Sequence, residues 1–438
     1  MKKTIRKIGI LFIAAGFLLC ASFSTATAQN QSQDTLKELI SSIPGISEVE
    51  RLKTDQFKDK YLLFVEQPID HKNPDLGSFK QRVFVMNAGL DKPTVVVTEG
   101  YGGAYAKMPR YREELSSIFD ANIIFVEHRY FLESTPEPLD WKYLTAENSA
   151  NDLHNVVTLF KNIYKGKWIA TGISKGGQTS LIYRAFFPED VDITVSYVAP
   201  LCRSREDGRH EPFIEKKVGT SEQRATILNF QKEILKKRTR LQPKFDSLCL
   251  SNKYTFNLPL NNIYDYSVLE FSFSFWQWGN SIYEIPDSTA SDDQIFKYWM
   301  KISSPDYFVN NSSSTPFFVQ AARELGYYGY DIKPFKELLS IKNAEGYLTK
   351  LFLPEGSEFK FDKTLYKKLK RFVATTDKKM LFIYGEYDPW SAVKVNEPKH
   401  KNVVVMVQPK GSHRSRIGNM PEELRNEAIR TLKQWLSE

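Results

Sequence analysis

The stretch that decides the fold is GISKGG at Gly172–Gly177, the one G-x-S-x-G in this chain of 438 residues. It follows an apolar run that ends at Thr171, and a helix-like segment opens near Gln178. A serine between glycines at a strand-to-helix turn is typical of a nucleophile elbow. Amides at the start of the following helix favour a developing negative charge. We therefore interpret Ser174 as a nucleophile, in preference to a residue of a plain glycine-rich turn.

A serine hydroxyl needs a base and an acid, and after an elbow of this kind the acid precedes the base in the chain. Met380–Tyr384 reads as a buried strand, and Asp388 follows it on a loop that continues into proline. Asn402–Gln408 reads as the next strand, and His413 follows it. Loops at the carboxyl ends of parallel strands meet at one edge of a sheet. The sequence thus predicts Asp388 as the acid and His413 as the base.

Two other residues compete for these roles. Glu386 lies on the same loop as Asp388, but the proline and small residues after Asp388 fit an acid loop better. His400 precedes its strand and is expected at the opposite edge of the sheet. Both are the weaker candidates.

An oxyanion hole needs two amide donors. One should be the amide of Lys175, directly after the nucleophile. The second should come from the glycine-rich loop Glu99–Gly103, which follows the β-branched run Thr94–Thr98. The amides of Tyr101 and Gly102 are the two candidates there. A phosphate-binding loop is the competing interpretation, but the chain lacks both a G-K-[ST] and a dinucleotide fingerprint.

Short apolar runs that do not alternate with polar residues favour strands buried on both faces of a parallel sheet. Helix-length segments separate them, so the pattern indicates an α/β sheet. The expected strands are 61–67, 79–87, 94–98, 122–127, 168–172, 192–198, 380–384 and 402–408.

The alternation stops for a long stretch in the middle of the chain. This stretch contains helix-like charged segments at Ser221–Thr239 and Asp331–Lys342. We expect a mostly helical insertion, or lid, at 201–379, between the two parts of the α/β domain at 29–200 and 380–438.

The N-terminus reads as a secretory signal peptide. Four basic residues precede the apolar run Ile8–Phe23, which leads to a small-residue site at Ala26–Ala28, so cleavage is expected before Gln29. A membrane anchor is the alternative, but the run is shorter than the roughly 20 apolar residues that span a bilayer. We expect an exported, periplasmic or secreted protein with no stable membrane anchor.

Composition is that of a globular protein, 42% hydrophobic and 26% charged. Removing the leader lowers the net charge from +8 to +4, which gives little support for a nucleic-acid partner. The mature chain keeps Cys202 and Cys249, and one disulfide or two buried thiols are both open in an oxidising compartment. No pattern of metal ligands or cofactor binding stands out.

Several ordered motifs resemble one group of serine peptidases. Gln67–His71 and Phe125–Phe131 resemble the prolyl carboxypeptidase and dipeptidyl-peptidase group. The elbow, Glu99–Tyr101 and Gly411–Arg414 resemble more closely its relative, the PS-10 family of secreted tripeptidyl aminopeptidases. The carboxypeptidase branch usually has a different elbow and several disulfides. Two cysteines in the mature chain therefore favour the aminopeptidase branch.

The resemblance implies an α/β-hydrolase fold with a large, mostly helical lid. It implies Ser174, Asp388 and His413 as the catalytic residues, in agreement with the loop argument. It also implies an exopeptidase that releases short peptides, tripeptides above all, from a free N-terminus, often with proline near the scissile bond. Peptides are thus the expected partners.

An aminopeptidase must hold a free α-ammonium group, and a carboxylate is the expected partner. Glu324 is our first candidate because it lies with Gln320 in a segment that resembles the lid of the relatives. Glu99 and Trp276 are further candidates for substrate binding. The other acidic residues considered are Glu206, Asp207, Glu211, Glu270 and Glu284. The aromatic block Phe271–Trp278 is expected to form the lid's own core or to line a proline pocket.

Three other functions compete with an aminopeptidase. A prolyl carboxypeptidase or dipeptidyl peptidase uses the same fold. A carboxylesterase or lipase uses the same three residues and favours an open apolar groove over a charged anchor. A non-catalytic binder has no need of an intact catalytic set.

Overall fold

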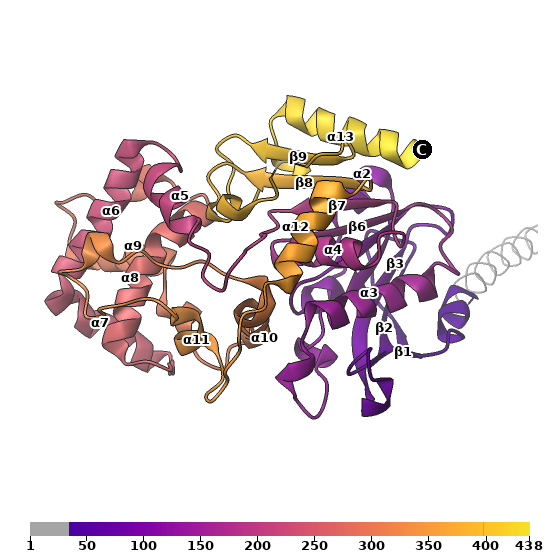
Figure 1. The fold of residues 1–438 in the computed structure, drawn as a ribbon, viewed down its shortest axis with the longest axis horizontal. Helices are drawn as coiled ribbons and strands as arrows, with labels where there is room; N and C mark the ends of the chain where they lie inside the picture. The colour runs from indigo at the N-terminus through magenta and orange to yellow at the C-terminus, as the bar shows by residue number, and fades with distance from the viewer. Residues whose placement is uncertain (1–34, 397) are drawn as a thin grey trace, which may run out of the picture.

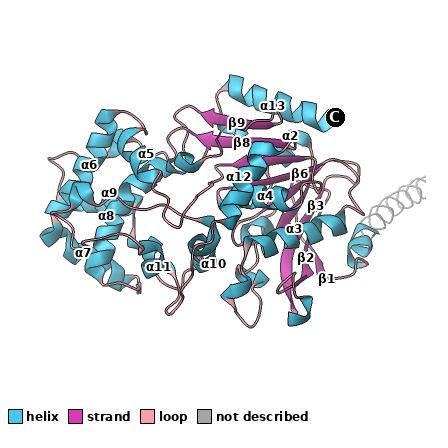
Figure 2. Cartoon of the chain, in the orientation of Figure 1, coloured by secondary structure: helices cyan, strands magenta, loops and turns pink. Residues whose placement is uncertain are grey.

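The fold is built on one mixed sheet. The structure is a computed structural model that describes residues 35–396 and 398–438, so the predicted leader lies outside the described residues. Nine strands follow the order β1-β2-β3-β5-β4-β6-β7-β8-β9 (Figures 1 and 2). Pairs from β1 to β5 along the sheet are antiparallel, and all pairs from β5 to β9 are parallel. The strands are β1 (Ile46–Arg51), β2 (Asp59–Pro68), β3 (Ser78–Asn87), β4 (Thr94–Thr98), β5 (Asn122–Val126), β6 (Trp168–Ile173), β7 (Ile193–Tyr197), β8 (Lys379–Gly385) and β9 (Val403–Gln408).

This sheet, with the elbow after β6, is the α/β-hydrolase fold that the sequence predicts. All eight expected strands are present. The ninth strand, β1, is absent from the strands expected from the sequence. Residues 35–41 are helical, and β1 follows as a partly exposed edge strand with an irregular register against β2. An edge strand of this kind lacks the buried apolar run that identifies the others.

Helices cover both faces of the sheet (Figure 1). On one face, α3 (Ala146–Phe160), α4 (Lys175–Phe186) and α12 (Thr364–Thr375) bury apolar side chains against the strands. On the other, α2 (Glu114–Phe119) and α13 (Glu422–Ser437) do the same. Helices on both faces bury a parallel sheet, so the carboxyl ends of its strands remain as the place for a site.

The segment between β7 and β8 is largely helical and lies beside the sheet (Figure 1). It has an apolar core of its own. We propose that the lid is residues 201–379 without α12, which packs on α4. The lid helices are α5 (His210–Lys216), α6 (Ser221–Lys236), α7 (Arg238–Ser251), α8 (Leu260–Gln277), α9 (Asp292–Ile302), α10 (Thr315–Gln320) and α11 (Tyr347–Phe352).

The lid region differs from the sequence prediction in one helix, and it shows the state of the two cysteines. The expected helix at Asp331–Lys342 is wrong, since only a short 3-10 turn forms there, at Lys333–Phe335. The Asp265 carboxylate accepts hydrogen bonds from the amides of Ser340 and Ile341, which removes those amides from any helix. In the same region of the molecule, Cys202 and Cys249 are buried free thiols. No helix within the described residues is long and apolar enough to cross a membrane.

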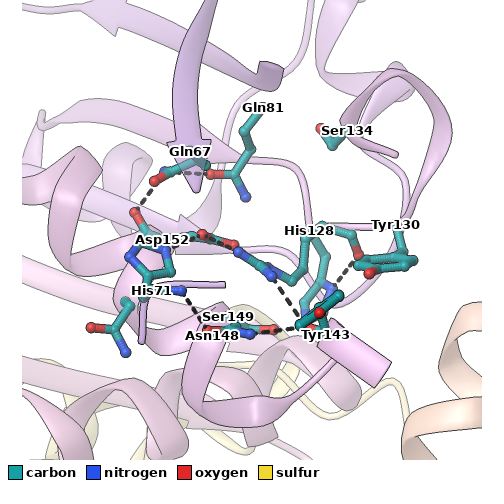
Figure 3. Close-up of polar contacts among 12 residues, drawn as sticks. Gln67, His71, Gln81, His128, Tyr130, Ser134, Tyr143, Asn148, Ser149 and Asp152 are labelled. Atoms are coloured by element: carbon teal, nitrogen blue, oxygen red, sulfur yellow. Dashed lines mark hydrogen bonds and ion pairs between the residues drawn. The ribbon is translucent and has the colours of Figure 1, made fainter. Parts of the chain in front are cut away.

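A buried polar network ties the first half of the sheet to α3 (Figure 3). Arg129 donates through Nε and Nη2 to the two carboxylate oxygens of Asp152, at 2.6 and 2.7 Å. It also donates to the carbonyls of Pro68 and Ile69. His71 Nε2 lies 2.7 Å from the same carboxylate. The network therefore fixes the loop after β5, which faces the elbow, through charge-assisted hydrogen bonds.

We predict that Asp152→Asn lowers the free energy of unfolding by about 3–5 kcal/mol. The substitution leaves the buried Arg129 guanidinium without its counter-charge. Urea unfolding followed by circular dichroism measures the loss.

Glu147→Gln is the matched control, because Glu147 lies on the same helix in an exposed pair with Lys72. That pair should contribute below about 1 kcal/mol. Equal losses in the two variants would contradict the role assigned to Asp152.

Candidate active site

Ser174 lies in the turn between β6 and α4, with φ of 56° and ψ of −119°. A positive φ is strained for serine. Two glycines permit the turn. A Cβ on Gly172 would lie 2.3 Å from the Gly176 carbonyl, and a Cβ on Gly176 would lie 2.8 Å from the Thr98 oxygen. The turn therefore holds Ser174 at the carboxyl edge of the sheet.

Asp388 and His413 meet at the same edge. Asp388 follows β8 and caps the short turn after it, where its Oδ1 accepts the Trp390 amide at 3.1 Å. Its other oxygen lies 2.7 Å from His413 Nδ1, and both side chains are buried. This contact leaves Nε2 of the imidazole for a partner on the other side of the ring.

Ser174 and His413 line one cavity, although no hydrogen bond joins the Ser174 hydroxyl to the imidazole among the described residues. Catalytic hydrogen bonds of this kind often form only with substrate bound. The rival acid, Glu386, accepts the Lys410 amide at 2.7 Å and does not line the cavity. His400 lies before β9 and is also outside it.

The glycine-rich loop after β4 packs against the start of α4. A Cβ on Gly100 would lie 2.6 Å from the Gly176 amide nitrogen. The Lys175 amide is at the first position of α4 and has no partner within the helix. In the loop, the Gly103 amide donates to Glu127, whereas the Tyr101 amide faces the Glu99 carboxylate.

Buried charges surround this loop. The Lys175 ammonium lies over the rings of Tyr101 and Phe131, at 5.8 and 5.6 Å, and has no hydrogen-bond partner within the described residues. Its burial lowers the pKa of Lys175 to about 7. Glu99 accepts a hydrogen bond from the Tyr105 hydroxyl at 2.6 Å, and burial raises its pKa. The surroundings of the elbow therefore disfavour fixed charge.

The central cavity, about 540 Å³ in volume, lies between the sheet edge and the lid. Along one side runs α8, which contributes residues at helical spacing: Glu270, Ser274, Gln277 and, just after its end, Trp278. Aromatic side chains from the α/β domain and from the lid form much of the remaining wall, among them Tyr101, Tyr307, Phe317, Phe318, Tyr327, Tyr328 and Trp390. Such a wall suits an apolar ligand part, and the polar residues of α8 add directional contacts.

Two carboxylates line this cavity, Glu99 and Glu270, and Glu270 is the less exposed of the two. Its oxygens accept hydrogen bonds from Ser274 and from the hydroxyls of Tyr328 and Tyr330, the latter two at 2.8 and 2.7 Å. Burial raises the pKa of Glu270 to about 7, although the three hydroxyl donors act in the opposite direction. A carboxylate so placed is nearly balanced between its two protonation states at neutral pH.

Glu270 differs from the other buried acidic residues in the described part of the chain. Each of the others whose side chain is less than a tenth exposed forms an ion pair with a basic side chain, whereas Glu270 has hydroxyl partners alone. Glu99 and Glu324 are partly exposed and also form no ion pair within the described residues. The paired residues are Asp59 with Arg51, Glu127 with Arg82, Asp152 with Arg129, Asp207 with Arg209, Asp265 with Arg238, and Asp388 with His413. An unpaired buried carboxylate in a cavity is a candidate site for a cation.

The substrate-binding candidates from the sequence lie in different places. Glu99 lines the central cavity. Glu324 accepts the Ala146 amide at 2.7 Å, at the start of α3, and does not line the cavity. Gln320 is buried near the end of α10. Trp276 lines a separate apolar cavity of about 330 Å³ on the other face of α8.

Glu324 is the first candidate from the sequence for the ammonium partner, and Glu270 is one of the lower-ranked acidic residues. The signal for Glu270 was its spacing, since Glu270, Ser274 and Gln277 are polar positions on one helical face within an aromatic block. The aromatic members Phe271, Phe273 and Phe275 are buried in the lid core.

Comparisons with known proteins agree with this architecture. The chain matches the PS-10 peptidase S37 family over residues 28–437. It is 30% identical to the prolyl tri/tetrapeptidyl aminopeptidase of Streptomyces mobaraensis over 451 aligned positions, which cover 99% of this chain and 92% of that protein. It is 28% identical to the probable serine protease EDA2 of Arabidopsis thaliana over 145 positions, 29% of this chain and 30% of that protein.

Among solved structures, a proline iminopeptidase from Mycobacterium smegmatis is similar with a TM-score of 0.41 and 13% identity. The match covers 85% of this chain and 98% of that one. The family match and the Streptomyces relative both span nearly the whole chain. The chain therefore belongs to the PS-10 peptidase S37 family and is a serine peptidase.

Proposed function

We propose that this protein is an exopeptidase that releases tripeptides from the free N-terminus of short peptides. The observation that carries the proposal is the unpaired Glu270 carboxylate in the same cavity as Ser174 and His413. A peptide α-ammonium is the cation that an aminopeptidase must bind, and the hydroxyl donors around Glu270 leave room for one more charged partner. The resemblance to the Streptomyces aminopeptidase supports the same activity.

In the proposed reaction, Ser174 Oγ attacks the carbonyl carbon and His413 Nε2 takes the hydroxyl proton. Asp388 holds the imidazole through Nδ1, at 2.7 Å, and stabilises its positive charge. The amide of Lys175, together with that of Tyr101 or Gly102, stabilises the oxyanion. His413 then protonates the leaving amine. Water, activated by the same imidazole, hydrolyses the ester to Ser174 and restores the enzyme.

The spacing along α8 supports release of three residues. Glu270 precedes Gln277 by seven positions, and the Gln277 carbonyl accepts the His413 amide at 2.9 Å. Seven helical residues rise about 10 Å. Three extended residues span about 10–11 Å. A tripeptide therefore fits between an ammonium group at Glu270 and a scissile carbonyl beside His413.

The aromatic wall supports proline just before the scissile bond. Tyr101 packs against Phe317, with ring centroids 5.5 Å apart, and both line the cavity with Ser174. A pyrrolidine ring offers a compact apolar surface and has no amide hydrogen to satisfy. The Streptomyces relative is named for prolyl peptides, which favours the same preference here.

The alternatives predict different cavities. A prolyl carboxypeptidase binds the substrate carboxylate beyond the scissile bond and needs no partner for an α-ammonium group, so it leaves the unpaired Glu270 without a role. A carboxylesterase on the same three residues needs no end anchor. We place both below the aminopeptidase for this reason.

We further propose that residues 1–28 direct export and are removed. The family match begins at residue 28, next to the predicted cleavage point.

We predict that wild-type enzyme cleaves Ala-Ala-Pro-aminomethylcoumarin and fails to cleave its N-acetyl form, because acetylation removes the ammonium charge. Ser174→Ala should lose at least a thousandfold in kcat for the free-amine substrate. Fluorescence assays measure both. Equal cleavage of the blocked and free substrates would exclude an aminopeptidase, and full activity of Ser174→Ala would exclude the proposed nucleophile.

We predict that Glu270→Gln raises KM for free tripeptidyl substrates by roughly tenfold to a hundredfold, the loss of a charged hydrogen bond of about 1.5–3 kcal/mol. Glu284→Gln is the control, since Glu284 is an exposed lid residue paired with Lys301. The pH profile separates charge from packing. With the pKa of Glu270 raised to about 7, binding should strengthen as pH rises through 7 and the carboxylate ionises. It should weaken above about 8, where the substrate ammonium loses its proton.

The Gln variant should lose the rise in binding through pH 7 that depends on Glu270. An unchanged KM and an unchanged profile in Glu270→Gln would move the anchor elsewhere.

We predict that the exported mature protein begins at Gln29. Mass spectrometry of the protein recovered from the periplasm and medium checks the N-terminus. Retention of residues 1–28 on an exported protein would contradict the cleavage site.

A further inference from the structure

The rim of the central cavity keeps two large apolar side chains exposed on either side of the reacting groups. Ile173, directly before Ser174, is 47% exposed, and Trp278, near His413, is 45% exposed. Both line the cavity. Exposed apolar side chains next to a reaction centre mark a surface that contacts a ligand.

Trp278 is held in place from both sides. Its amide donates to the Ser274 carbonyl at 3.1 Å at the end of α8, and its ring meets the His413 ring edge-on at 5.9 Å. Gly279 follows with φ of 67°, and a Cβ there would lie 3.0 Å from Ser412 Cβ. The turn therefore needs glycine, and the indole is fixed beside the imidazole.

A guanidinium group completes the rim. Arg414 lies over the Trp278 ring at 5.7 Å, is exposed, and forms no ion pair with any described residue. Its neighbour Arg416 is committed to the carbonyls of His413 and Ser415. The cavity therefore carries a carboxylate at Glu270 and a free cation at the opposite end of the α8 segment that lines it.

The order along α8 assigns the two ends. Glu270 comes first, Gln277 contacts the His413 loop, and Trp278 lies beyond it. If the released tripeptide lies between Glu270 and His413, the rest of the substrate leaves past Trp278. This step rests on the proposed function, because it uses the direction in which the peptide binds.

We propose that Trp278, Ile173 and Arg414 form the subsite for the leaving peptide, which takes a large apolar residue directly after the scissile bond and a carboxylate close behind it. The apolar side chain packs on the indole and Ile173, and the carboxylate pairs with the Arg414 guanidinium. A carboxylate has two sources in a peptide, the C-terminus and an acidic side chain. The favoured substrates are thus short peptides whose N-terminal ammonium group pairs with Glu270 and whose carboxylate pairs with Arg414.

The apolar part is tested by the ratio of kcat/KM for Ala-Ala-Pro-Leu-Gly-amide to that for Ala-Ala-Pro-Gly-Gly-amide, measured by mass spectrometry of the products. We expect wild-type enzyme to favour leucine about tenfold. The ratio should fall to about one in Trp278→Ala and stay near the wild-type value in Trp278→Phe. Leu250→Ala is the control, because Leu250 is 81% exposed on the lid away from the cavity. An undiminished ratio in Trp278→Ala would overturn the subsite.

The charged part is tested with Arg414→Gln, and with Arg240→Gln as the control on α7. The substrates are Ala-Ala-Pro-Leu-Asp-amide, its Asn counterpart, and Ala-Ala-Pro-Leu as free acid and as amide. We expect wild-type enzyme to favour each carboxylate form about threefold, less so in high salt. If Arg414→Gln loses the preference within the Asp/Asn pair, the carboxylate that Arg414 binds is an acidic side chain. If it loses the preference within the acid/amide pair, that carboxylate is the C-terminus. Loss in neither pair would overturn the role of Arg414.

The same peptides separate the subsite from the function on which it rests. If wild-type enzyme cleaves none of the free-amine peptides, the proposed aminopeptidase fails. If it cleaves them without dependence on Trp278 and Arg414, only the leaving-peptide subsite is wrong.

Discussion

The close approach of the first turn of α4 to the sheet is the constraint on which the candidate site depends. Backbone meets backbone there, since added Cβ atoms on Gly100, Gly172 and Gly176 would all lie within 2.8 Å of main-chain atoms. No flexible side chain can give way at these contacts. The strained conformation of Ser174 persists because the packing around it determines it from several sides. The loop Glu99–Gly103, which carries candidate oxyanion donors, is placed by the same contacts, so these amides and the proposed nucleophile Ser174 are positioned together.

The loop that carries His413 is one of the places where the lid contacts this centre. The His413 amide donates to the Gln277 carbonyl, and Gly279 packs against Ser412. The helix that carries Glu270 therefore has a defined register relative to the imidazole. Because α8 is a rigid element, the span from Glu270 to the reaction centre is set by helical rise and not by loop conformation. A carboxylate on a loop would give a less definite length for the released peptide.

Local signals in the sequence are sufficient for the elbow and for every strand of the sheet except β1. Buried strands carry continuous apolar runs, and Gly172 is required by its close contact with Gly176 in the same motif. The contact that requires Gly176 comes from Thr98 on the neighbouring strand. The same signals placed Asp388 and His413 at one edge, where the structure brings them to 2.7 Å.

The choice between Glu324 and Glu270 needed information that no local pattern contains. Both lie in helical segments of the lid, and desolvation raises the pKa of both. Glu324 accepts a hydrogen bond from the Ala146 amide at the start of α3, 178 residues away in the chain. Glu270 is surrounded by Tyr328 and Tyr330, which reach it from 58 and 60 residues away. The edge strand β1 was missed for a related reason, since its pairing partner and not its own pattern makes it a strand.

The partners of Glu270 explain why it suits a cation better than the other buried carboxylates do. An arginine beside it would neutralise the charge permanently, as Arg129 does for Asp152. Hydroxyl groups donate hydrogen bonds to the ionised form but carry no charge, so they stabilise the carboxylate only in part. Its pKa near 7 expresses this incomplete compensation. In the proposed function, an incoming ammonium group would supply the missing charge and lower that pKa. It would thereby remove the cost of a buried, uncompensated carboxylate, which favours binding of the substrate.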